Sequence, residues 1–142
     1  MIQLSTNKSV VGPWVFQQID KVWHPNGREC VGLVNEEGVL AGTVVEEYTG
    51  ASVQMHIAVK HPHVPLRKFI VAGFSYVFAD LGVEQALGII NSTNLKSLNF
   101  ALKLGFEPIA IIPDTHIGSD SVILRLLRKN CRWLPQHIRQ AA

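Results

Sequence analysis

The sequence predicts an α/β domain in which an antiparallel meander is followed by a βαβ unit on one mixed sheet. Three Val-rich runs, separated by short turns that contain glycine, indicate the meander. Farther along the chain, apolar residues at helical spacing lie between two strand-like runs, which is typical of a parallel crossover. The 142 residues, 47% of them hydrophobic and 17% charged, can build one continuous core, so we expect a single domain over residues 1–142.

The first predicted element is a helix at residues 13–20. Pro13 suits its first turn, where a backbone N–H has no partner inside the helix, and Trp14, Val15 and Ile19 are expected to face the core. The three strands of the meander are expected next, at residues 30–35, 39–48 and 52–60.

The crossover begins after a segment that cannot be regular. Pro62 and Pro65 each remove a backbone donor and restrict the residue before them, which excludes helix and strand from residues 61–65. Residues 66–81 carry the helical pattern, and Gly82 suits the end of that helix. We expect residues 84–90 to form a strand parallel to the third strand.

A shorter helix is expected after this strand, capped by Asn94 or Thr93 and ended by Gly105. The last two strands are expected at residues 107–112 and 121–127, joined by a polar loop. The expected core face of the short helix consists of Leu95, Leu98, Ala101 and Leu102.

The charge balance gives little indication of a nucleic-acid partner. The chain has 13 Lys and Arg against 11 acidic residues, a formal net charge of +2. The longest basic cluster, residues 125–132, is expected to place solvated side chains at the edge of the last strand. Nucleic-acid binding is the weaker alternative for this cluster, and it would use Arg125, Arg128, Lys129 and Arg132.

Neither the thiols nor the imidazoles are spaced as metal ligands, so no metal site is expected. Cys30 and Cys131 match no metal motif and are expected to be reduced. His61 and His63, with His116 far away, lack a third ligand at a defined spacing. The N-terminus has no signal-peptide core, and no apolar run approaches the ~20 residues of a membrane span, so we expect a cytoplasmic protein.

Residues 91–106 carry the most specific motif in the chain. The helix starts with Asn94-x2-Ser97 and ends with Lys-Leu-Gly-Phe at residues 103–106, which resembles the acyl-CoA-binding half of the Gcn5-related N-acetyltransferases, the GNAT family. The predicted order of elements agrees with the fold of that family. Further motifs resemble a group of small bacteriophage-encoded GNAT proteins: residues 12–15, 55–58, 74–82 and 131–134.

The resemblance implies that acetyl-CoA binds in a gap beside the strand at residues 52–60. A splayed strand leaves backbone groups free, and a peptide-like ligand can pair with them. The phosphate loop departs from the family because residues 64–69 contain no glycine, although the first turn of any helix has free N–H groups. The residues implied to bind acetyl-CoA are Ile57, Ala58, Val59, Leu66, Arg67, Lys68, Asn91, Asn94 and Phe100.

The resemblance also implies a catalytic acid. Many members of the family have a Tyr, proposed to protonate the CoA thiolate, where this chain has Ala101. The Asn-x2-Ser form resembles the branch that acetylates the N-termini of ribosomal proteins, in which the Ser is proposed to take this role. Ser97 is therefore the first catalytic candidate, and packing or a hydrogen bond within the helix is the alternative role for its hydroxyl.

A catalytic base could come from the strands before the crossover. His56 is the first candidate because imidazole titrates near neutral pH. Strand alternation places it on the face opposite Met55 and Ile57, so a hydrogen-bonded structural role is the alternative. Glu46 and Glu47 are further candidates, or solvated charges at a strand end.

Together these features predict an acetyl-CoA-dependent N-acetyltransferase acting on an unidentified amine, which could belong to a protein N-terminus, a lysine or a small molecule. The missing Tyr and the missing glycines favour an alternative, a catalytically inactive GNAT-fold phage protein that serves as a protein-interaction module. The resemblance implies the host cytoplasm as the location. An apolar C-terminal tail adds a homodimer to the expectations.

Overall fold

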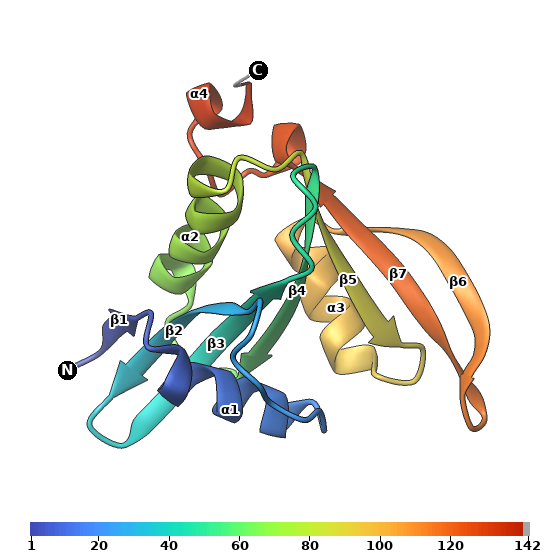
Figure 1. Ribbon diagram of the computed structural model, residues 1–142, viewed down its shortest axis with the longest axis horizontal. Helices are drawn as coiled ribbons and strands as arrows, with labels where there is room; N and C mark the ends of the chain where they lie inside the picture. The colour runs from blue at the N-terminus through green and yellow to red at the C-terminus, as the bar shows by residue number, and fades with distance from the viewer. Residues whose placement is uncertain (141–142) are drawn as a thin grey trace.

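The computed structural model describes residues 1–140, which form a seven-stranded sheet of order β1-β2-β3-β4-β5-β7-β6 with helices on both faces (Figure 1). The predicted α/β class with a mixed sheet is confirmed. The strands are β1 (Gln3–Ser5), β2 (Glu29–Asn35), β3 (Gly38–Glu46), β4 (Ser52–Val59), β5 (Gln85–Asn91), β6 (Glu107–His116) and β7 (Ser119–Leu127).

The first helix, α1 (Lys8–Gln18), starts five residues earlier than the sequence predicts. Asn7 caps it, because its side-chain oxygen accepts a hydrogen bond from the backbone N–H of Ser9. The prediction that Pro13 opens the helix is therefore wrong. Pro13 lies inside the helix on its exposed side.

The predicted meander and crossover are confirmed: β2, β3 and β4 pair antiparallel in sequence order, and β4 pairs parallel with β5. The crossover helix α2 (Arg67–Ser75) continues into a π-helical turn, η1 (Tyr76–Asp80). Gly82 follows with a φ of 69°, a left-handed conformation that glycine adopts without steric cost. Residues 61–65 are irregular, as Pro62 and Pro65 predict.

The short helix α3 (Leu95–Leu104) begins at its Asn94 cap and ends at Gly105, as predicted, with Gly105 at a φ of 111°. Its core face is only partly as predicted. Ala101 is buried, but Leu95 is 66% exposed and Leu102 is 48% exposed. The side of α3 that carries Ala101 and Leu104 covers the sheet instead, so Leu95 and Leu102 have nothing to pack against.

The last hairpin is longer than predicted. Residues 113–120 were expected to be a loop, but β6 runs to His116 and β7 starts at Ser119, which leaves Ile117 and Gly118 as the turn. Gly118 has a φ of 79°, as tight hairpin turns require. Every residue of β6, the strand at the edge of the sheet, is exposed.

The core is divided between the two faces of the sheet. Under α1, a small apolar cluster surrounds Val15, Phe16 and Val44. Under α2 and α3, a larger cluster includes Phe69 and Phe74 and continues past η2 (Arg128–Asn130) to Cys131, Leu134 and the short helix α4 (Gln136–Arg139). Within residues 1–140, no helix is long and apolar enough to cross a membrane.

Candidate functional site

The candidate site is a cleft that opens where β4 and β5 separate. The two strands pair only from Ser52 to Gln54 on β4 and from Gln85 to Leu87 on β5. Figure 1 shows them together at their upper ends and apart at their lower ends. Beyond the last pair lies a cleft of 1370 Å³, lined by residues of β4, β5, α3 and the segment after α1.

The cleft exposes backbone groups of β4 that have no strand partner among residues 1–140. In an antiparallel ladder, alternate residues direct both backbone groups toward the same neighbour. The N–H of Lys60 donates to Leu40 on the β3 side, so Ala58 also faces β3, whereas Ile57 and Val59 face the cleft. Ile57 and Val59 thus present N–H and C=O groups to the cleft, and the backbone of Ala58 does not.

Two helices begin at the wide end of the cleft. At the start of α3, Asn94 lines the cleft and its side-chain oxygen accepts a hydrogen bond from the N–H of Ser97. At the start of α2, Leu66 also lines the cleft. Arg67 and Lys68 follow in the exposed first turn of α2 but do not line the cleft. The first turn of α2 has no side-chain cap, so its N–H groups favour an anion, whereas at α3 the N–H groups of Leu95 and Ser97 already donate to Thr93 and Asn94.

The remaining predicted ligand residues lie along the same cleft. Asn91 ends β5, and Phe100 lies one turn along α3 from Ser97. Ser97 is half-buried, and within the described part of the chain its hydroxyl donates to no protein group. Ala101 also lines the cleft. The structure therefore brings Asn91 from β5 and Ser97 and Phe100 from α3 to one surface.

His56 lines the cleft from the opposite face of β4, where it forms a buried polar network. Its Nε2 lies 2.5 Å from Oε2 of Glu46, and Oε1 of Glu46 accepts a hydrogen bond of 3.1 Å from Nε of Arg28. The rings of Phe16 and His56 pack edge to face. The guanidinium carbon of Arg28 lies over the Phe16 ring, 4.4 Å from its centroid. With Glu46 accepting at Nε2, the neutral imidazole carries its proton there and leaves Nδ1 as an acceptor.

Burial shifts the proton equilibria in this network. Burial lowers the pKa of His56, and the hydrogen bond and charge of Glu46 offset this only in part. Burial also opposes ionisation of Glu46, but hydrogen bonds from Arg28 and His56 outweigh it, so the pKa of Glu46 lies below its ordinary value. Near neutral pH the network therefore holds a neutral imidazole and a carboxylate.

The other groups singled out from sequence do not form a second site. Burial raises the pKa of both free thiols, Cys30 and Cys131, to about 11. His61 and His63 have ring centroids 6.2 Å apart, and no group of three or more potential metal ligands occurs in residues 1–140. Glu47 is exposed, with a φ of 57°.

The C-terminal basic cluster is dispersed rather than forming one patch. Nε of Arg125 donates to Glu107 at 3.0 Å, and Arg128, expected to be solvated, is buried and donates to Glu84 at 2.7 Å. Arg132 stacks on Trp133 and donates to the carbonyl of Lys103 at the end of α3. These pairings arise because β7 ends at Leu127, so the basic residues lie on β7, on η2 and in the turn that follows η2.

The partners of His56 were not identified from sequence. Glu46 pairs with Gln54 across the ladder and is therefore the diagonal neighbour of His56 on the same strand face. The alternation of side chains along the two strands and the short turn between β3 and β4 could have predicted that Glu46 lies beside His56. No sequence pattern pointed to Arg28, because it reaches the network from the end of an irregular segment.

Comparisons with known proteins identify the fold. Neither family models nor curated sequences match this chain. Among solved structures, spermidine N-acetyltransferase SpeG from Vibrio cholerae in complex with CoA and spermine matches 94% of this chain and 98% of its own, with 13% identity and a TM-score of 0.65. A mutant form of the same enzyme matches 89% of this chain and 95% of its own, with 12% identity and a TM-score of 0.68.

A proposed phosphinothricin N-acetyltransferase matches 89% of this chain and 98% of its own, with 17% identity and a TM-score of 0.64. The chain thus has the fold of the GNAT acyltransferases, as its sequence predicts. At these identities the likeness extends to the fold alone.

Proposed function

We propose that this protein is an acetyl-CoA-dependent N-acetyltransferase that acts on an amine. The observation that carries the proposal is the cleft edge of β4, where Ile57 and Val59 present backbone groups without a strand partner. Pantetheine contains two amides and can pair with such an edge as a further strand would. The uncapped start of α2 at Leu66 would receive the phosphates, with Arg67 and Lys68 adding charge at the mouth, and Asn94 would lie farther along the ligand.

In the proposed reaction, the amine nitrogen attacks the thioester carbonyl, a C–N bond forms and the C–S bond breaks. The backbone N–H of Ile57 would stabilise the developing oxyanion. His56 would take the proton that the amine loses, with Glu46 fixing its tautomer through the 2.5 Å contact. Ser97, whose hydroxyl has no protein partner among residues 1–140, would donate its proton to the departing thiolate and regain one from solvent, to which His56 would release the proton from the amine.

Support also comes from the structural neighbours. They are N-acetyltransferases, and one of them was solved with CoA and the polyamine spermine. The acceptor of this chain stays open among protein N-termini, lysines and small amines. The bacteriophage origin and the cytoplasmic location remain predictions from the sequence resemblance.

Substitution by proline tests the β4 edge directly. Val59→Pro removes a backbone donor that faces the cleft and breaks no ladder bond, whereas Ala58→Pro removes a donor to β3. We expect Val59→Pro to retain its melting temperature within a few degrees and to bind acetyl-CoA at least about tenfold more weakly by calorimetry. Ala58→Pro should be destabilised by about 3 kcal/mol. Unchanged affinity in Val59→Pro would contradict the proposed binding mode.

Measurements of turnover then distinguish the proposed enzyme from the alternative, a catalytically inactive interaction module. Ser97→Ala should reduce kcat by about a hundredfold, as loss of a general acid does, with acetyl-CoA affinity nearly unchanged. Ser75→Ala, a serine of α2 that does not line the cleft, is the matched control. Equal turnover in both variants would remove Ser97 from the mechanism, and acetyl-CoA binding without turnover for any amine would favour the module.

A further inference from the structure

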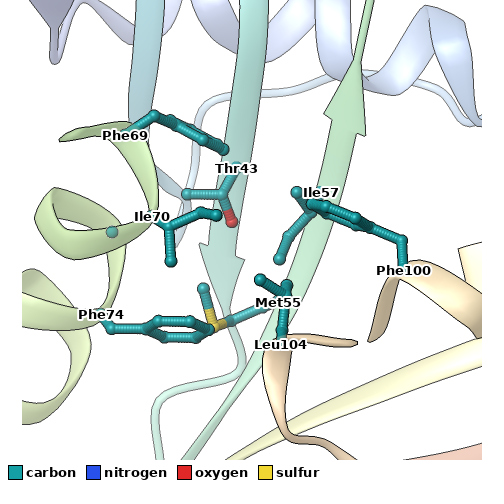
Figure 2. A pocket seen from close by; sticks show the side chains of 9 residues that line it. Thr43, Met55, Ile57, Phe69, Ile70, Phe74, Phe100 and Leu104 are labelled. Atoms are coloured by element: carbon teal, nitrogen blue, oxygen red, sulfur yellow. The ribbon is translucent and has the colours of Figure 1, made fainter. Parts of the chain in front are cut away.

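A small apolar cavity adjoins the cleft on the face of the sheet that α2 and α3 cover (Figure 2). Its volume is 10 Å³, which is room for about one water-sized group. On the α2 side its wall consists of Phe69, Ile70, Gly73 and Phe74. None of these residues lines the cleft.

Thr43 on β3 is the polar side chain of this cavity. It is 1% exposed, and its hydroxyl has no hydrogen-bond partner among the described residues. Figure 2 shows this oxygen pointing into the space between Ile70 and Ile57. An unpaired buried hydroxyl is unfavourable, and this one lies beside a small empty space rather than beside a hydrogen-bond acceptor.

Water is a poor occupant of the cavity. A buried water makes about three hydrogen bonds, and at least two are needed to offset its confinement. Thr43 supplies one partner, and the other side chains of the wall are apolar. A methyl or methylene group has the right size and needs no hydrogen bond. The cavity therefore suits the end of an alkyl chain.

The cavity and the cleft share a wall. Met55, Ile57, Phe100 and Leu104 line both spaces. Figure 2 shows Ile57 from β4 next to Phe100 from α3 on the cleft side of the cavity. Ile57 also carries backbone groups that face the cleft, so a thioester held by that backbone would lie one side chain away from the cavity.

We propose that this cavity receives the alkyl end of the acyl group and so sets the acyl length that the protein accepts, namely acetyl and propionyl rather than longer chains. The inference rests on the proposed function, because it assumes that an acyl-CoA occupies the cleft. The limit follows from the volume, since space for one water-sized group admits one carbon beyond the shared wall. Ile70 and Gly73 are then specificity-determining residues.

Two substitutions change the cavity by one carbon in opposite directions. A Cβ on Gly73 would lie 3.6 Å from Cγ2 of Thr43, an ordinary contact, so Gly73→Ala fills the cavity without a clash. Ile70→Val enlarges it by one methylene. Ile123→Val removes the same methylene from β7, outside both spaces, and is the matched control. All three changes are small enough to keep the fold.

Calorimetric affinities for CoA, acetyl-CoA, propionyl-CoA and butyryl-CoA test the proposal. In Gly73→Ala, the affinity for propionyl-CoA relative to acetyl-CoA should fall about fourfold, the ratio for burial of one methylene. In Ile70→Val, the affinity for butyryl-CoA relative to propionyl-CoA should rise by a similar factor. Free CoA has no acyl group, so its affinity should be the same in wild type and all variants.

The outcomes separate the two proposals. A chain-length preference that is identical in wild type, Gly73→Ala and Ile70→Val, with CoA bound normally, would overturn the acyl cavity and leave the proposed function standing. A shift of the same size in Ile123→Val would also overturn it, because the effect would then be general. Failure of the wild type to bind CoA at all would overturn both.

Discussion

The two faces of the sheet differ in how they accommodate a buried polar residue. Under α1, His56 is hydrogen-bonded to Glu46, and Glu46 also accepts a hydrogen bond from Arg28. Under α2 and α3, the hydroxyl of Thr43 borders a cavity and has no partner in residues 1–140. A satisfied network supports the fold, whereas an unsatisfied buried hydroxyl lowers stability, so the face under α2 and α3 has the less favourable arrangement.

Packing differs between the faces in the same way. A Cβ added to Gly42, on the α1 face, would lie 2.6 Å from Cγ2 of Val15, closer than such contacts occur. A Cβ on Gly73 would meet the sheet at an ordinary distance. The α1 face is therefore tightly packed at Gly42, and the face under α2 and α3 retains room beside the cleft. Four sets of substitutions test this contrast.

The largest expected effect is that of Glu46→Ala. Removing the carboxylate leaves the guanidinium of Arg28 and the ring of His56 without their partner in a site where Glu46 is only 13% exposed. We expect the free energy of unfolding to fall by about 3 kcal/mol in urea titrations. Glu46→Gln keeps the shape and one acceptor and should lose less. A loss below about 0.5 kcal/mol for the Ala variant would mean that the network does not support the fold.

The next effect compares two glycines. Gly42→Ala must displace Val15 or α1 and should destabilise the protein by about 2 kcal/mol, the usual cost of overpacking. Gly73→Ala, in the interior of α2, should stabilise it by up to about 1 kcal/mol because alanine favours the helix. Melting temperatures of the two variants provide the measurement. The packing contrast is refuted if both variants shift in the same direction.

A smaller effect of opposite sign is expected for Thr43→Val. Valine has nearly the shape of threonine and removes the unpaired hydroxyl, so the free energy of unfolding should rise by about 1 kcal/mol. Ser121→Ala is a useful contrast, because the buried hydroxyl of Ser121 lies 2.6 Å from that of Thr115. That variant should be destabilised by a similar amount. Destabilisation of Thr43→Val would show that its hydroxyl has a partner in the folded protein.

The smallest effect concerns pH. The pKa of His56 is lower in the folded protein than its ordinary value of 6.5, so the unfolded chain binds more protons below that pH. Stability should therefore be fully present above pH 6.5 and decline as the pH falls toward the folded pKa. His56→Gln should flatten this part of the stability profile. An identical profile in wild type and His56→Gln would rule out His56 as the titrating group.

Local sequence signals predicted most of the fold because each of them acts over a few residues. Helix α3 begins at Asn94 and ends at Gly105, as the capping preferences of these two residues predict. The start of α1 was missed because Pro13 is a common first-turn residue, and only the Asn7 cap marks the true start. The exposed side of α3 could not be foreseen, since it depends on where the helix lies over the sheet.

The candidate site was predicted less completely. The family-like motif led to Asn94, Ser97 and Phe100, which do line the cleft. Which backbone groups of β4 are free depends on the register with β3, and that register becomes visible only in the folded sheet. The cavity at Thr43 was missed although a lone hydroxyl in an apolar strand was a signal, because empty space is a property of packing between distant elements.

The exposed edge strand β6 has a consequence for solubility. It carries Ile109, Ile111 and Ile112 on the surface, and an apolar strand with a free edge invites chains to add to the sheet and aggregate. Pro108 and Pro113 interrupt this edge and deprive it of two N–H donors. We therefore expect these prolines to hinder further chains from pairing with β6 and extending the sheet.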